Sequence, residues 1–280
     1  MTQYASVRVA LCAVALALVA CPRDKNEDAL TLAEASQALE ETTLESQAQA
    51  LTSDTIEIST NFTIGQAARD AAAELREFIE TELPCAQLTL ENATLTVDYG
   101  VEGDSCLYHG KRITGQSRVS VAKNEQEDVL VEHTWTDLSN GIVEVDGHAT
   151  VTYTLDDPSR HVVHELTIVR LRDGWKLESE GDRTQRPLEG GIIEGFQVDG
   201  TRAWSSPRGD WSLSIEDVEM RWIDPVPQAG TYKLTTPKNK DLKLGFDRKD
   251  EDTISVTLAG PQREFVFDVS KTGTATRVDE

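Results

Sequence analysis

In the segment "HATVTYTLDDPSRHVVHELTIVRLRDGWKLES" (148–179), apolar and polar residues alternate with a period of two over much of its length. Val151 and Tyr153, for example, alternate with threonines. Such a run predicts a β-strand with one buried face and one solvated face. The Asp173-Gly174 pair between two runs is typical of a two-residue hairpin turn. The stretch therefore predicts consecutive antiparallel strands.

The same alternation extends from Gln87 to Val269. Asp-Gly pairs recur at 146–147, 173–174 and 199–200, with prolines between them. This spacing predicts two strands per period in a mainly β, antiparallel up-and-down meander over residues 85–272. Such a meander can close into a barrel, form a sandwich or remain open.

One amphipathic helix is predicted before the strands, in the region 55–84. The segment "TIGQAARDAAAELREFIETELPC" (63–85) places its apolar residues on one helical face, and Pro84 ends the helix. A helix that covers one face favours an open, curled sheet or incomplete barrel, because a closed barrel would need its lumen filled. The last residues, 273–280, are predicted to form a flexible tail.

Residues 21–54 are predicted to form an acidic tether, partly helical or disordered. They are rich in Ala, Glu, Gln, Ser and Thr, and their apolar stripe is ragged. A helix that docks on the β domain is the alternative for this segment.

The first twenty residues have the features of a secretory signal peptide. Arg8 precedes an apolar run from Val9 to Ala20, about a dozen residues, which is shorter than the 20 or so that span a bilayer. Small residues then precede Cys21. Cleavage after residue 20 would begin the mature chain at this cysteine.

The order Leu18-Val19-Ala20-Cys21 resembles the bacterial lipobox. That resemblance implies acylation of Cys21, anchoring in the cell envelope through fatty acyl chains, and exposure to the periplasm or cell surface. The leader and general composition are similar to those of uncharacterised predicted lipoproteins of myxobacteria. The residue after the cysteine is proline, not the aspartate that retains many lipoproteins at the inner membrane, and the analogy favours the outer membrane.

Two further cysteines, Cys85 and Cys106, remain after Cys12 leaves with the leader and Cys21 is acylated. In an exported chain this pair predicts a disulfide, because that compartment is oxidising. The formal net charge of −22 argues against binding to nucleic acid or to anionic lipid headgroups. Membrane contact is expected through the acyl chains alone.

The most aromatic segment offers a speculative ligand-binding group. A hairpin turn at Pro207-Arg208 would bring Trp204 and Trp211 together, where the indoles and Arg208 could stack on a sugar or hold a peptide. Packing in the sheet core is the more common role of such tryptophans, and it is the preferred interpretation here.

A metal site is considered and set aside. A turn at Asn140-Gly141 would place His133 opposite His148, as a pair that could ligate zinc or copper. A turn at 146–147 would abolish that pair. Exposed histidines on the sheet face are the preferred interpretation.

No catalytic motif occurs in the sequence: it lacks GxSxG, HExxH and P-loop patterns. We therefore expect no enzymatic activity, no cofactor and no metal. The expected function is that of an envelope interaction or scaffold protein, which binds another envelope protein through the face or edge of its sheet. The alternative is a carrier that holds a lipid or another apolar ligand in an open barrel.

Overall fold

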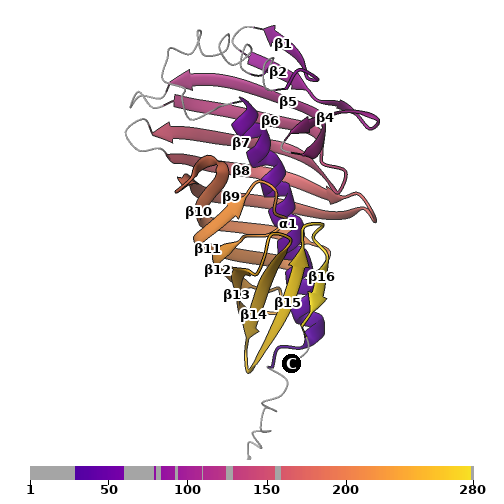
Figure 1. Cartoon of the computed structure of the whole chain (residues 1–280), viewed down its shortest axis with the longest axis vertical. Coiled ribbons are helices and arrows are strands. Elements are labelled where there is room, and N and C mark those ends of the chain that lie inside the picture. The colour runs from indigo at the N-terminus through magenta and orange to yellow at the C-terminus, as the bar shows by residue number, and fades with distance from the viewer. Residues whose placement is uncertain are drawn as a thin grey trace, which may run out of the picture.

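The computed structural model describes residues 29–59, 79, 83–91, 94–108, 110–123, 129–154 and 159–278. These residues form one helix and sixteen strands. The strands make a long, twisted sheet that curls around the helix (Figure 1). The leader and Cys21 lie outside the described residues.

Each strand of the main ladder pairs antiparallel with the next one along the chain, apart from the small flap of β3 and β4. The strands are β1 (Gln87–Glu91), β2 (Thr94–Asp98), β3 (Gly100–Val101), β4 (Asp104–Tyr108), β5 (Lys111–Lys123), β6 (Val129–Ser139), β7 (Val143–Thr154), β8 (Ser159–Arg170), β9 (Trp175–Leu188), β10 (Gly191–Ser206), β11 (Gly209–Arg221), β12 (Ala229–Thr235), β13 (Asp241–Arg248), β14 (Thr253–Gly260), β15 (Arg263–Ser270) and β16 (Ala275–Arg277). β1 and β16 are the two ends of the sheet, which is not closed. The predicted open, up-and-down antiparallel meander is confirmed.

Two of the three Asp-Gly turn predictions are wrong. Only the pair at 173–174 is a turn, whereas Gly147 and Gly200 lie inside β7 and β10. A Cβ atom at Gly147 would lie 2.2 Å from the carbonyl oxygen of Glu165, and one at Gly200 would lie 2.3 Å from that of Asp182. Both glycines have positive φ angles. Glycine is needed at these positions because the next strand's backbone approaches too closely for a side chain.

The helix, α1 (Leu32–Ser59), runs along the inside of the curled sheet (Figure 1). It begins with a capping box, in which Thr31 and Glu34 exchange hydrogen bonds between side chain and backbone. Every residue from 48 to 58 is buried. These residues make about three turns, so all sides of this part of the helix are covered.

The prediction of a tether over residues 21–54 is therefore corrected, because residues 32–54 belong to the buried helix. The alternative, a helix docked on the sheet, describes them. The region 55–84 was assigned to a later helix, but residues 55–59 are the end of α1. Most of that predicted helix, including residues 60–78, lies outside the described residues. Ile79 and Leu83, on its predicted apolar face, are buried.

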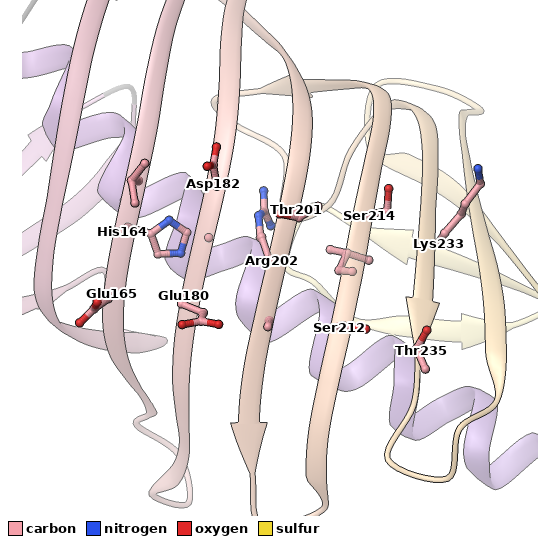
Figure 2. A pocket seen from close by; sticks show the side chains of 14 residues that line it. His164, Glu165, Glu180, Asp182, Thr201, Arg202, Ser212, Ser214, Lys233 and Thr235 are labelled. Atoms are coloured by element: carbon pink, nitrogen blue, oxygen red, sulfur yellow. The ribbon is translucent and has the colours of Figure 1, made fainter.

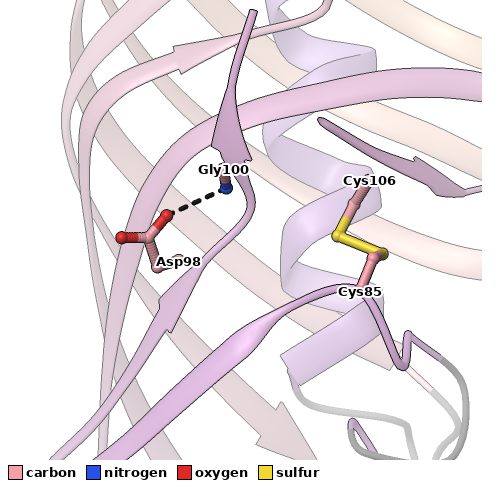
Figure 3. Close-up of a disulfide and its surroundings, with 4 residues drawn as sticks. All are labelled: Cys85, Asp98, Gly100 and Cys106. Atoms are coloured by element: carbon pink, nitrogen blue, oxygen red, sulfur yellow. Dashed lines mark hydrogen bonds between the residues drawn. A yellow bond between two sulfur atoms is a disulfide. The ribbon is translucent and has the colours of Figure 1, made fainter. Parts of the chain in front are cut away.

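The predicted disulfide joins Cys85, just before β1, to Cys106 in β4 (Figure 3). It closes a separation of 21 residues and fastens the flap to the start of the β domain. Beside it, the Asp98 side chain accepts a hydrogen bond of 2.9 Å from the Gly100 amide. At the other end of the chain, the predicted tail is partly ordered, because residues 275–277 form β16 and pair with β15.

Candidate functional site

A row of polar side chains on α1 faces the sheet. Its members are spaced four residues apart and are at most 7% exposed: Glu41, Glu45, Gln49, Ser53 and Glu57. Residues at i and i+4 lie one above the other on a helix, so the five side chains form a continuous stripe. Together with their partners on the inner face of β8–β10, we call them the polar ladder.

Two ion pairs lie within the polar ladder. Glu45 accepts a hydrogen bond from Arg202 Nη1, and both side chains are 1% exposed. Glu57 accepts from Arg160 Nη1 at 2.9 Å. Paired burial of this kind is needed, because an isolated charge in the interior is strongly unfavourable.

In the middle of the polar ladder, the ring of His164 contacts one cationic and one neutral side chain. Arg183 Nη1 lies against His164 Nδ1, and the Gln49 amide lies 2.9 Å from Nε2 of the same ring. An arginine can only donate, so Nδ1 accepts and the neutral ring carries its proton on Nε2. The Gln49 atom at this ring nitrogen is Nε2, and Gln49 Oε1 is buried without a hydrogen-bond partner among the described residues. Burial holds the pKa of His164 far below its usual value, and Arg183 lowers it further.

The ladder contains three buried arginines and three buried glutamates, but these side chains do not all pair with one another. Arg160, Arg183 and Arg202 are all buried, whereas only Glu45 and Glu57 pair with them. Within the described chain, Arg183 Nε has no hydrogen-bond partner. Burial and the neighbouring Arg202 lower the pKa of Arg183. Burial of these charged groups where α1 crosses the sheet is therefore energetically unfavourable.

The three residues of the speculative ligand-binding group do come together. Trp204 and Trp211 are directly opposite each other on β10 and β11, with stacked rings 5.9 Å apart. Both are at most 5% exposed. Trp204 Nε1 donates to Glu41 at 3.2 Å, and Arg208 donates to Glu40 and Glu41.

These contacts extend the ladder and hold the start of α1. Arg208 also lies over the ring of Trp175, 4.6 Å from its centroid. The indole faces and the guanidinium are thus used in contacts within the chain. This geometry matches the packing interpretation of the tryptophans.

A turn at residues 140–142 joins β6 to β7, but it does not bring the two histidines together. His133 pairs with Ala149 instead of His148, because the turn is longer than two residues, with Ser139 opposite Glu144, and a bulge between Trp135 and Leu138 shifts the register back by one residue. His133 is buried beside Trp135, so the expectation of an exposed histidine is wrong there and at His164. Burial lowers the pKa of His133 to about 3.

A group of carboxylates at the same bulge is the arrangement in the described chain that could hold a metal ion. Oxygen atoms of Asp137, Glu144 and Asp146 lie within 4.8 Å of one another. Partial burial raises the pKa of Glu144, and the two aspartates raise it further. The Asp137 amide already donates to Asp146 at 3.0 Å. We assign no ion to this group. It consists only of carboxylates, and Asp146 already accepts a hydrogen bond within the bulge.

The outer face of β7–β12 is hollowed (Figure 2). Figure 2 looks through β8–β12, with α1 behind the strands. One hollow has a volume of about 550 Å³, and a neighbouring one of about 650 Å³ shares its Glu165 and Glu180. Small side chains form the floor on β10 and β11, including Thr201 and Ser214.

The two shared glutamates are a cross-strand pair of like charge, since Glu165 lies directly opposite Glu180. Like charges at directly opposite positions are unfavourable in an antiparallel sheet. The outer face thus combines a concave shape with carboxylates that the described residues do not neutralise by a hydrogen bond or an ion pair.

Comparisons with known proteins add no identity: no protein-family model, curated protein or solved structure matches the chain. In the part of the chain that the structure describes, no helix has both the length and the apolar character needed to span a membrane.

Proposed function

We propose that the chain is a lipid-anchored protein of the bacterial cell envelope that binds another envelope protein through its sheet. Acyl chains on Cys21 would supply the anchor, with the outer membrane favoured over the inner membrane. Catalysis, cofactors and nucleic acid have no part in this proposal.

One contrast supports a binding scaffold: at β8–β10 the inner face is covered by α1, and the outer face of the same strands is open. α1 covers the inner face through the polar ladder, whereas the hollows on β7–β12 have no covering element among the described residues. The outer face is therefore the part of these strands that remains available to a partner.

The carrier alternative receives less support from the same contrast. A carrier of acyl chains needs an apolar lumen left free. Here the inner face of β8–β10 presents three buried arginines, and two of them, Arg160 and Arg202, pair with glutamates of α1.

The anchor is tested by the intact mass of the protein purified from membranes of its native host, beside a Cys21→Ala variant. The proposal predicts a mass that fits residues 21–280 plus acyl chains. It also predicts that the variant loses both the acyl mass and the membrane association. A soluble, unmodified mature chain from the native host would refute the anchor.

The binding surface is tested with a photo-crosslinking residue at Thr201, in the outer hollow, and with the same residue at Glu264 on β15 as a matched exposed control. A discrete protein adduct in intact cells at position 201, absent at 264, is the expected result. Adducts at neither position, together with stoichiometric non-covalent lipid in native mass spectra, would favour the carrier instead.

A further inference from the structure

The start of the described chain is fixed at one edge of the sheet. Leu30 is fully buried, and its amide donates to the carbonyl of Pro261 in the β14–β15 turn at 3.0 Å. Lys240, beside the β12–β13 turn, donates to the carbonyl of Ala29 at 3.2 Å. A small hollow lined by Leu30, Arg208 and residues 236–238 shows that the β10–β11 turn lies at the same edge. We call the turns 207–208, 236–240 and 261–262 the turn edge.

The turn edge lies within a short reach of the proposed anchor. Eight residue steps separate Cys21 from Ala29, which is at most about 29 Å of fully extended chain. α1 then leads away from this edge for about 42 Å, given 1.5 Å per residue. Its far end is held by pairs such as Asp54 with Lys111 of β5 and Thr55 with Trp135 of β6.

Charge is distributed unevenly along the same direction. Residues 229–280 contain nine Lys or Arg and nine Asp or Glu, so the whole net charge of −22 lies in residues 1–228. Bacterial membranes with anionic lipids repel acidic surfaces over about a Debye length. The neutral end, β12–β16, can approach such a membrane, whereas the acidic strands β1–β11 are repelled.

The turn edge also carries exposed cations. Lys238 is 71% exposed at its side chain and pairs only with Glu34 among the described residues. Arg263, the first residue of β15, is exposed. These side chains can reach lipid phosphates without unfolding any part of the sheet.

From these observations we infer that the turn edge is the membrane-facing surface, with Lys238 and Arg263 directed at lipid headgroups. α1 then stands away from the bilayer, so that β7–β9, which carry part of the hollowed outer face, lie farther from the bilayer than β12–β15. This inference rests on the proposed acylation of Cys21. It refines the expectation of repulsion from anionic lipid, which applies to the acidic end of the molecule.

The test uses the full acylated chain in vesicles of phosphatidylcholine with a minor fraction of phosphatidylglycerol and a nitroxide-labelled headgroup lipid. A fluorophore is attached to Lys238→Cys at the turn edge or, as the matched control, to Glu132→Cys on the exposed face of β6. Both proteins keep the native disulfide, so the added cysteine is the free thiol. Circular dichroism and melting curves confirm that both variants fold.

Several-fold stronger quenching at position 238 than at 132 is the expected result. Equal quenching at the two positions, or stronger quenching at 132, would overturn the inference. Flotation of the vesicles with and without Cys21→Ala separates the two proposals. If flotation depends on Cys21 but quenching is equal, the anchor stands and the orientation fails; if flotation is independent of Cys21, the anchor itself fails.

Discussion

The inner face of the sheet differs sharply between its centre and its C-terminal end. On β8–β10 the inward side chains include the arginines and His164 of the polar ladder. On β13–β15 the inward side chains are aliphatic or aromatic: Leu242, Leu244, Phe246, Ile254, Val256, Leu258, Phe267 and Val269. In both regions, buried side chains alternate with more exposed ones along the strands.

The difference shows that alternation reports burial but not the chemistry of the buried face. At the centre, α1 supplies the acidic and amide groups that make buried arginines tolerable. At the C-terminal end, burial of aliphatic and aromatic side chains stabilises the sheet. If this comparison is right, the two regions should respond differently to substitution.

The largest effect is expected for Glu45→Ala in the polar ladder. Removing one partner of a buried pair leaves Arg202 buried and unpaired, which should lower the free energy of unfolding by about 3–5 kcal/mol. Urea unfolding measures this. The control is Glu216→Ala, which breaks an exposed pair with Lys233 and should cost at most about 1 kcal/mol. Equal costs for the two variants would contradict the burial of the Glu45–Arg202 pair.

At the C-terminal end, Leu258→Ala tests the apolar packing. Leu258 of β14 is fully buried and lies opposite Leu244 of β13. The cavity should lower the free energy of unfolding by about 2–5 kcal/mol. The cost should be the same at pH 5 and pH 7, because no titratable group is changed. A cost that varies with pH would show that charged groups also stabilise this region.

The disulfide lies at the opposite end from this packing and should act independently of it. Replacing both Cys85 and Cys106 by serine removes a closed loop of 21 residues, which the chain-entropy model values at about 3 kcal/mol. Its cost should add to that of Leu258→Ala in the triple variant. Strong non-additivity would indicate that the two ends are coupled through the sheet.

Acid should destabilise the protein through the buried His133 of β6. Burial and Arg160 lower the pKa of His133 to about 3. The unfolded state takes up a proton near pH 6.5, so stability falls as the pH drops from 6.5 toward 3. The loss is about 1.4 kcal/mol per pH unit, or about 2 kcal/mol at pH 5.

His133→Phe removes this term and should reduce the loss of stability between pH 7 and pH 5 by about 2 kcal/mol relative to the parent. Asp54, whose pKa burial raises to about 6, acts with the opposite sign but is present in both proteins. The difference between them therefore reports His133. Identical pH profiles would mean that His133 titrates normally.

The strands and the disulfide could be predicted because they depend on local patterns. Period-two alternation and the count of cysteines were sufficient for them. Turns at Asp146-Gly147 and Asp199-Gly200 were predicted wrongly, because the same dipeptide serves equally where two strand backbones approach closely. Only the register with the neighbouring strand separates these roles.

A docked helix is only the alternative prediction for this segment because buried polar side chains interrupt its apolar stripe, although Leu39, Leu51 and Ile56 also belong to the core. A search for an apolar stripe treats Glu41, Glu45 and Glu57 as a solvated face. The signals that were present are the capping box at Thr31 and Glu34 and the repetition of polar residues every four positions. Their partners lie more than a hundred residues away, as with Glu45 and Arg202. No local pattern reveals such pairs.

Hydrogen exchange of the full chain tests the central claim, that α1 is an integral part of the β domain. The structure predicts that the backbone amides of residues 48–58 exchange as slowly as those of β8 and β9. Exchange of these amides at the rate of an unfolded chain, while the strands remain protected, would show that residues 32–59 are a tether and that the polar ladder does not form.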